Sequence, residues 1–286
     1  MTGPPRSVLY VPASRRPLLE RIPALRADLV IVDLEDGVAP AEKDAARENV
    51  RQAVAAGALA GDRPFMLRVN GGPTGPPPED LTLVGFAKPA WVVLPKAEDP
   101  GLVRLLATRF ADHGADTALM IETAAGVGCA RAMAGAHAGV RMLILGSADL
   151  RLSLGSRPDK KRRWERHALA EVLLAARCHG CAAIDSVYFR YRDEPGLRAH
   201  ARIARDLGYD GKSCIHPAQV PPIHDVYRSG RDEIAWARRV LAAWAAGDGA
   251  LRGIVAMDGE MIEALHVTVA ERILQRGAKK GTRRAP

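Results

Sequence analysis

The sequence has no long apolar stretch and few aromatic residues. No run reaches the ~18–20 apolar residues that a membrane-spanning helix needs, and residues 1–7 lack the features of a signal peptide. We therefore expect a cytoplasmic protein that does not engage a membrane. Aromatic residues make up 5% of the chain, and no basic patch is interleaved with them. This disfavours a nucleic-acid-binding protein. The net charge of +8 therefore favours anionic small molecules as partners.

Cysteine is also scarce, with four residues: Cys129, Cys178, Cys181 and Cys214. Cys178 and Cys181 form a C-x-x-C pair, but it falls at the end of a predicted helix. A redox pair would instead follow a strand and open a helix, where the helix dipole lowers the thiol pKa. A zinc site would require a second Cys/His pair at similar spacing, and the sequence contains none. We predict four reduced thiols.

Apolar runs typical of buried strands alternate with helical patterns from about residue 7 to residue 225. Such alternation implies right-handed parallel crossovers, and eight strand–helix units close a barrel. We therefore predict an α/β fold, a (β/α)8 TIM barrel over residues 1–225. The runner-up is an open doubly wound sheet. That fold would be expected to have a glycine-rich turn after the first strand, and residues 12–15 do not contain one. The predicted strands are 7–11, 29–34, 65–69, 91–94, 117–121, 141–145, 182–188 and 212–215.

Helical patterns separate most of these strands, and two more follow the barrel. Residues 226–286 would form a helical extension, with helices at 232–246 and 259–276, within the same single domain. It would pack on the barrel or on a neighbouring subunit. A glycine- and proline-rich loop, residues 71–78, follows the third strand. The helices between strands are predicted at 18–27, 40–56, 102–113, 125–136, 163–179 and 195–207.

Polar residues gather where the predicted strands end. In a barrel of this kind, such positions point into the mouth of the active site. Chance placement would put as many charged residues at the strand starts, where Arg141 and Lys212 are the clear cases. The residues at strand ends are Asp33, Glu35, Asp36, Arg68, Lys96, Glu122, Asp149 and His216.

This set has a chemical interpretation. Glu122 and Asp149 follow adjacent strands, and two carboxylates plus water are the usual protein contribution to Mg²⁺. Arg68 offers a planar fork for a carboxylate or an enolate oxygen. Glu35 and Asp36, together with Asp33, either hold metal-bound water or pair with Arg68 and Lys96. Taken singly, each residue is equally compatible with a helix cap or a structural ion pair.

At these residues the sequence resembles the citrate lyase beta subunit and malyl-CoA lyase family, within the HpcH/HpaI aldolase superfamily. The resemblance implies a TIM barrel of the phosphoenolpyruvate/pyruvate type that assembles as a homotrimer or hexamer. It implies Mg²⁺ held by Glu122 and Asp149, a substrate-binding Arg68, and coenzyme A as part of the substrate. Each matching segment alone is weakly specific, but together and in order they are very specific. They are residues 6–12, 33–38, 68–70, 94–96, 121–124, 146–150 and 207–217.

The same resemblance extends to further residues. Glu35 and Asp36 are candidate catalytic groups beside Arg68. Related enzymes carry a C-terminal Asp that serves as acid/base or in thioester hydrolysis, and here Glu263 replaces it. The extra methylene displaces the carboxylate, which disfavours hydrolysis more than lyase chemistry. Candidate substrate contacts are Arg6, Arg15, Lys43, Lys96, Arg68 and Glu122.

The favoured hypothesis is a Mg²⁺-dependent lyase acting on a 3-hydroxyacyl-CoA thioester such as citryl-, malyl- or citramalyl-CoA. Alternatives are the beta subunit of an acyl-carrier-protein-dependent citrate lyase complex and a metal-dependent pyruvate aldolase. A non-catalytic anion- or nucleic-acid-binding protein is the alternative from a different class. The basic run from Lys160 to Arg163 is either a solvated face or a contact for an acidic carrier or CoA. A second run, residues 279–284, is interpreted as a solvated chain end.

Overall fold

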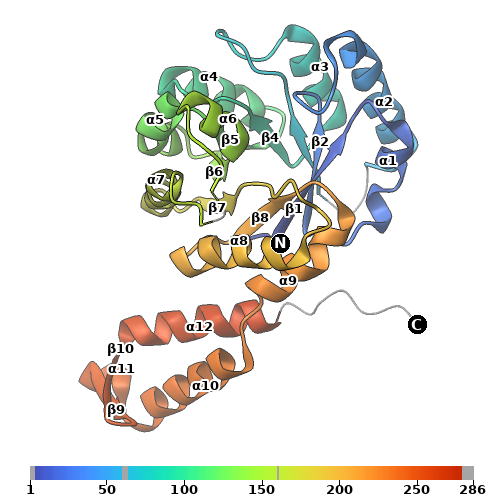
Figure 1. Ribbon diagram of the computed structural model, residues 1–286. Helices are drawn as coiled ribbons and strands as arrows, with labels where there is room; N and C mark the ends of the chain where they lie inside the picture. Colours follow the sequence, from blue (N-terminus) through green and yellow to red (C-terminus); the bar gives the residue numbers. More distant parts are fainter. Residues whose placement is uncertain (1–3, 60–63, 160, 279–286) are drawn as a thin grey trace. The chain divides into compact units, whose positions relative to one another are not determined.

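The computed structural model describes residues 4–59, 64–159 and 161–278. The chain divides into two compact units, residues 4–226 and the part that begins at Tyr227 (Figure 1). The division lies close to the boundary predicted at residue 225. No helix in the described ranges is long and apolar enough to cross a membrane.

The first unit contains eight parallel strands that close into a barrel (Figure 1). Closure is direct, because β1 pairs with both β2 and β8. The predicted (β/α)8 barrel is therefore confirmed, and the open doubly wound sheet is wrong. The strands are β1 (Ser7–Pro12), β2 (Leu29–Asp33), β3 (Met66–Arg68), β4 (Trp91–Leu94), β5 (Asp116–Ile121), β6 (Val140–Leu145), β7 (Ala182–Asp185) and β8 (Gly211–Cys214).

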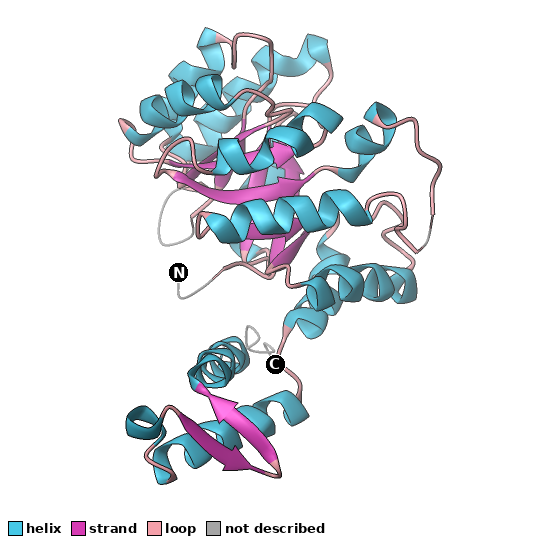
Figure 2. Cartoon of the chain, turned by 90° about the vertical axis from the view of Figure 1, so that its left-hand side faces the viewer, coloured by secondary structure: helices cyan, strands magenta, loops and turns pink. Residues whose placement is uncertain are grey.

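Helices cover the outside of this barrel (Figure 2). Three of them were absent from the sequence prediction. One is α3 (Pro78–Ala87), which starts with a proline and carries acidic residues in its first turn, both favourable at a helix start. The others are α6 (Ser147–Ser153) and α9 (Val220–Tyr227). The remaining helices are α1 (Arg16–Glu20), α2 (Lys43–Ala55), α4 (Pro100–Ala111), α5 (Ala124–Ala134), α7 (Arg166–Cys178) and α8 (Glu194–Leu207), with short 3₁₀ turns at Ile22–Ala24, Pro40–Glu42 and Pro217–Gln219.

The barrel interior is filled by side chains from its strands. Strands of a covered parallel sheet are buried on both faces, which is why their sequences are nearly continuous apolar runs. Each fully buried aliphatic side chain contributes roughly 1.5–3 kcal/mol. This packed interior supports the polar residues at the carboxyl ends of the strands. The interior residues are Val8, Leu29, Ile31, Met66, Val93, Ala118, Met120, Met142, Ile144 and Ile184.

The second unit is not wholly helical, so the prediction of a helix over 259–276 is wrong at its start. It consists of α10 (Arg231–Ala246), α11 (Gly249–Arg252), β9 (Ile254–Met257), β10 (Glu260–Glu263) and α12 (Ala264–Ala278). β9 and β10 form an antiparallel hairpin closed by Asp258 and Gly259, both with positive φ. Asp-Gly is a preferred pair for such a two-residue turn.

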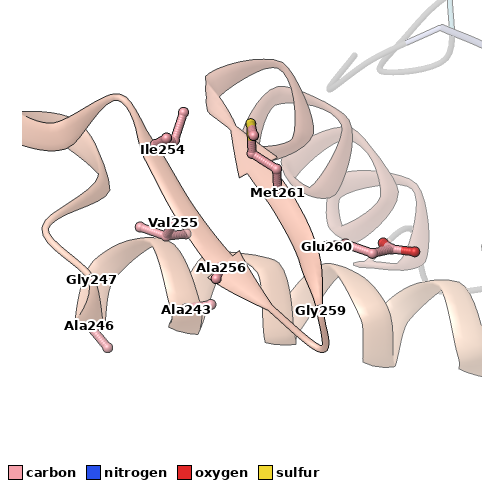
Figure 3. Close-up of a pocket in the computed structure, with 9 residues that line it drawn as sticks. All are labelled: Ala243, Ala246, Gly247, Ile254, Val255, Ala256, Gly259, Glu260 and Met261. Carbon is pink, nitrogen blue, oxygen red and sulfur yellow. The ribbon is translucent and has the colours of Figure 1, made fainter.

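A small apolar core joins the hairpin to α10 and α12, with Ala237, Val240, Ile262 and Ala270 at its centre. Figure 3 shows the hollow that the hairpin and α10 form at the edge of this unit. Whether the unit packs on the barrel or on a neighbouring subunit remains a prediction.

Candidate active site

A cavity of about 530 Å³ opens at the carboxyl ends of the barrel strands. Most of the strands contribute a side chain to it, so residues distant in sequence meet there. The predicted rim position of the polar residues is confirmed for Asp33, Asp36, Arg68, Glu122 and Asp149. The lining residues are Tyr10, Pro12, Asp33, Asp36, Gly37, Arg68, Met120, Glu122, Leu145, Gly146, Ser147, Ala148, Asp149, Val187, Phe189, Ser213 and Ile215.

Arg68, the last residue of β3, is fixed at the cavity wall by two carboxylates. Its Nε and Nη2 each donate to an oxygen of Asp33 at 2.7 Å, and its Nη1 lies 2.9 Å from Glu35 Oε2. The guanidinium also lies over the Tyr10 ring, 5.1 Å from its centroid. Burial opposes the charge, but the hydrogen bonds with Asp33 and the neighbouring acidic groups raise the Arg68 pKa above its ordinary value. A permanently charged, rigidly oriented fork results.

Lys96 follows β4 and connects the acidic groups of the rim. Its backbone N–H donates to Glu122 Oε1 at 2.8 Å. Its ammonium contacts Glu35 and lies 3.4 Å from Asp36 and 3.6 Å from Asp149. Lys96 has a positive φ of 49°, a conformation that costs a non-glycine residue about 1–3 kcal/mol and is found most often at functional sites. Lys96 is thus both a backbone donor and a charge partner for the rim.

Glu122 and Asp149 are the predicted metal ligands. Glu122 follows β5 and is only 2% exposed, while Asp149 lies in the first turn of α6 with a half-buried side chain. Burial raises the pKa of Glu122 to about 7, although the Lys96 amide and the charge of Arg68 act in the opposite direction. A Cβ atom at Gly146 would lie 2.5 Å from Glu122 Oε2. The absence of a side chain at residue 146 therefore leaves room for the carboxylate.

The charges of the rim fit a divalent cation. Acidic groups outnumber basic ones by two, and Glu122 is buried without enough positive charge to keep its pKa in the ordinary range. Among the described residues no three His, Cys, Asp or Glu side chains cluster as a metal cage. A two-carboxylate Mg²⁺ site, completed by water and substrate, needs no such cage. The groups counted are Asp33, Glu35, Asp36, Glu122 and Asp149 against Arg68, Lys96 and Lys43.

One predicted substrate contact, Arg6, is wrong, and a second, Lys43, makes internal hydrogen bonds, so that its contact with substrate stays a prediction. Arg6 precedes β1 and lies at the opposite end of the barrel, where it makes a two-pronged ion pair with Asp28 at 2.9 Å. Lys43 is close to the rim, but its ammonium is used internally. It donates to the carbonyl oxygens of Leu34 and Glu35 at 2.6 and 2.7 Å. Lys43 therefore braces the loop after β2, which carries Glu35 and Asp36.

Other predicted residues have different outcomes. Arg15 is exposed just after β1, on the cavity side, and its contact with substrate remains a prediction. Glu263 ends β10 in the second unit, so its catalytic role also remains a prediction. Glu35 is brought to Arg68 and Lys96, but it does not line the cavity. All four cysteines are free thiols, as predicted.

Arg162, in the basic run after α6, lies neither on a solvated face nor where an acidic carrier or CoA could contact it. This side chain is 1% exposed, and it donates to Glu165 at 2.7 Å and to Asp185 at 2.6 and 3.0 Å. It therefore fastens the loop against β7. Arg163 is exposed and pairs with Asp159. Lys160 and residues 279–284 lie outside the described residues.

Among the contributors to the cavity that sequence reasoning missed are Tyr10, Gly146 and Phe189. Tyr10 lies two residues after the inward-facing Val8 on β1, so strand alternation could have found it. Gly146 directly follows β6, but its closeness to Glu122 depends on two strands meeting. Phe189 follows β7 in a loop with no regular pattern.

Known proteins resemble this chain over nearly its whole length. The family model described as HpcH/HpaI aldolase/citrate lyase matches residues 6–217. A (3S)-malyl-CoA thioesterase from Cereibacter sphaeroides is 38% identical over 279 residues, covering 95% of this chain and 94% of the relative. A citrate lyase subunit beta-like protein from Mycobacterium tuberculosis is 37% identical over 276 residues, covering 95% of each chain.

Among solved structures, CitE from Mycobacterium tuberculosis in complex with magnesium, acetoacetate and coenzyme A has a TM-score of 0.82 at 35% identity. The match covers 98% of this chain and 100% of that one. These matches confirm the family predicted from the strand-end segments: the chain belongs to the HpcH/HpaI aldolase/citrate lyase family.

Proposed function

We propose that this protein is a Mg²⁺-dependent carbon–carbon lyase that cleaves a 3-hydroxyacyl-CoA thioester to a keto acid and an acyl-CoA. Citryl-CoA, malyl-CoA and citramalyl-CoA are the candidate substrates. The observation that carries the proposal is the pair Glu122 and Asp149 beside the fixed guanidinium of Arg68 in one cavity. The relatives that act on malyl-CoA, and the CitE complex with magnesium and coenzyme A, support it.

Glu122 and Asp149 would hold the Mg²⁺ ion, which acts as a Lewis acid on the substrate carbonyl or hydroxyl oxygen when bound. Arg68 binds the keto-acid carboxylate or the oxygen on which negative charge develops as the C–C bond breaks. Asp33 and Glu35 hold the guanidinium in one orientation before substrate arrives. This preorganisation means that little reorganisation is needed during the reaction.

Cleavage also requires that the substrate hydroxyl lose a proton. Asp36 is the candidate acceptor, because it lines the cavity and is partly solvent-accessible. Partial burial opposes its ionisation, but hydrogen bonding with Glu35 and the charges of Lys96 and Arg68 lower the Asp36 pKa. It is therefore ionised at neutral pH and able to accept a proton. Glu35, held between Arg68 and Lys96, positions these cations instead.

Thioester hydrolysis is the second candidate, favoured by the thioesterase relatives. The two reactions give different products from malyl-CoA. A lyase gives glyoxylate and acetyl-CoA, whereas a thioesterase gives malate and free CoA. Glu263 in place of the aspartate expected for hydrolysis favours the lyase. A carrier-protein-dependent citrate lyase subunit or a pyruvate aldolase would use the same pair of metal ligands and the same arginine.

The test is an assay of the purified protein with each of the three CoA thioesters and Mg²⁺. We expect keto-acid release from one of them, abolished by EDTA and by Glu122→Ala. Glu171→Ala, an exposed carboxylate on α7, is the matched control and should behave like the wild type. Malate with free CoA as the sole products would replace the lyase by a thioesterase. No turnover of any thioester by folded protein would contradict both.

Several predictions about the whole molecule remain proposals. We expect a homotrimer or hexamer in the cytoplasm, without a nucleic-acid or membrane partner. Light scattering at several protein concentrations measures the oligomer directly. A monomer at all concentrations would contradict the expected assembly.

A further inference from the structure

Lys96 has a backbone conformation that lysine rarely takes. Its φ is 49°, in the left-handed region that glycine adopts without strain. Strained conformations of this kind persist where the surrounding structure fixes them, and they are most often found at functional sites. Because glycine would satisfy the backbone at residue 96 at lower cost, the lysine there indicates that its side chain has a role of its own.

The turn that carries Lys96 is held against the end of β5. The Lys96 N–H donates to Glu122 Oε1 at 2.8 Å, and the Ala97 N–H donates to the Met120 carbonyl oxygen at 3.2 Å. A Cβ atom at Gly126, in the first turn of α5, would lie 2.6 Å from the Ala97 carbonyl oxygen. These contacts involve the backbone of the turn. A change of the Lys96 side chain should therefore leave the turn in place.

The ammonium of Lys96 lies among carboxylates from two separate parts of the chain. It contacts Glu35, and it lies 3.4 Å from Asp36 Oδ2 in the loop after β2. It also lies 3.6 Å from Asp149 Oδ2 in α6. Asp149 is a proposed metal ligand, and Asp36 is the proposed proton acceptor. One positive charge therefore neighbours both kinds of acidic group.

This charge has opposite effects on a metal ion and on the acidic groups beside it. Two unit charges roughly 5 Å apart in a partly solvated site repel by an energy that corresponds to a several-fold change in affinity. The Lys96 side chain is 42% exposed, so solvent screens part of this repulsion. A divalent ion at Asp149 should therefore bind more weakly in the presence of the ammonium. The same ammonium attracts Glu35 and Asp36 and holds them together beside Arg68.

We propose that Lys96 is a positioning residue that weakens Mg²⁺ binding at Glu122 and Asp149 while it orders the acidic groups that take part in the reaction. This assignment rests on the proposed function for the identity of the metal ligands. Removal of the charge should therefore tighten Mg²⁺ binding and slow turnover. A residue that only supports the fold would weaken both when it is removed, and a residue that only contacts substrate would change neither the metal affinity nor its direction.

The first experiment is a calorimetric titration with Mg²⁺ alone, without substrate. Lys96→Met removes the charge and keeps the length of the side chain, and it should lower the Mg²⁺ dissociation constant about three- to tenfold. Lys96→Gly, which also relieves the backbone strain, should do the same. Lys96→Arg retains the charge and should stay within about twofold of the wild type. Lys88→Met is the matched control, because Lys88 is an exposed lysine with a φ of 46° at the end of α3, and it should leave the affinity unchanged.

The second experiment measures turnover at saturating Mg²⁺ with the thioester that the wild type cleaves. Lys96→Met should lower kcat about tenfold or more, because Glu35 and Asp36 lose the cation that orders them. Lys88→Met should match the wild type. Circular dichroism shows whether each variant is folded, and Lys96→Gly serves in place of Lys96→Met if the latter is not. Unchanged or weaker Mg²⁺ binding by folded Lys96→Met would overturn the inference. A rise in KM alone would make Lys96 a substrate contact and would overturn it as well.

The role of Lys96 and the lyase activity can fail separately. If Glu122→Ala abolishes Mg²⁺ binding but Lys96→Met does not tighten it, only the role of Lys96 is wrong. Tighter Mg²⁺ binding by Lys96→Met, in a protein whose wild type cleaves none of the thioesters, would retain the effect of Lys96 on the metal and remove the lyase. Mg²⁺ binding that Glu122→Ala leaves unchanged would remove the proposed metal ligands and, with them, the role of Lys96.

Discussion

Gly146→Ala is the sharpest test of the metal site, because it adds one methyl group next to Glu122. The backbone at Gly146 has φ −104° and ψ 86°, which an alanine tolerates without the strain of a positive φ. The effect is therefore steric. The new Cβ would lie 2.5 Å from both the Cβ and the Oε2 of Glu122. An ordinary contact needs about 1 Å more, so the carboxylate must move by that order.

A displacement of this size has a known effect on catalysis and on metal binding. A misplacement of about 1 Å can lower an enzyme's rate roughly 100-fold, and changes to groups that orient a metal ligand commonly cost 10–100-fold in metal affinity. We expect Gly146→Ala to weaken Mg²⁺ binding and kcat/KM by factors in this range. Overpacking should also cost about 1–3 kcal/mol of stability, so circular dichroism must show that the variant is folded at the assay temperature.

Gly128→Ala is the matched control. Gly128 lies within α5, and a Cβ there would meet no atom within 4 Å. Alanine should stabilise the helix by up to about 1 kcal/mol and leave Mg²⁺ affinity unchanged. Calorimetric titration with Mg²⁺ and the thioester assay measure both variants. Wild-type affinity and turnover in Gly146→Ala would refute the reasoning that Glu122 needs the space at residue 146 to hold the metal.

Three further perturbations test the site and the fold around it. Arg162→Met should destabilise the protein by about 3–5 kcal/mol, because it leaves buried carboxylates without their partner. The control Arg163→Ala, at a side chain that is 74% exposed, should change the stability by no more than about 0.5 kcal/mol. Equal urea midpoints for the two variants would contradict this prediction. Burial, then the charge of Lys212, lowers the His200 pKa from 6.5 to about 3, so the unfolded chain binds a proton that the folded chain excludes. The stabilisation from neutral His200 is therefore complete above pH 6.5 and lost as pH falls toward 3, by up to about 1.4 kcal/mol per pH unit, and His200→Gln should flatten this slope in urea unfolding at pH 5–7. Mg²⁺ at about 100 times its dissociation constant should stabilise the fold by about 2.7 kcal/mol, a rise in Tm that Glu122→Ala should abolish.

The sequence by itself determined the barrel and most of its active rim. Continuous apolar runs mark strands that are buried on both faces, and their alternation with helical patterns permits few topologies. Because parallel strands all point the same way, every residue that follows a strand reaches the same end of the barrel. Arg68, Glu122 and Asp149 could therefore be assigned to one site without knowing a single contact between them. The same rule could have excluded Arg6, which comes before its strand.

Other features carried a local signal that went unused or misled. Asp258 and Gly259 form a turn pair that could have indicated the hairpin in place of a helix. The basic run that includes Arg162 has the composition of a solvated surface. Its burial follows from Asp185, which β7 places 23 residues later in the chain. No periodicity within either segment encodes that encounter.

The tertiary structure alone decided which charges are partners. Lys43 and Lys96 are similar side chains near the same rim, yet one donates to backbone carbonyl oxygens and the other contacts Glu35. Local sequence fixes the direction and the buried face of each element, because these depend on neighbouring residues. Pairing depends on distances of a few ångströms between separate strands and loops, which the packing of the whole barrel sets. For that reason most charged members of the site could be predicted, but the division between chemical and supporting roles could not.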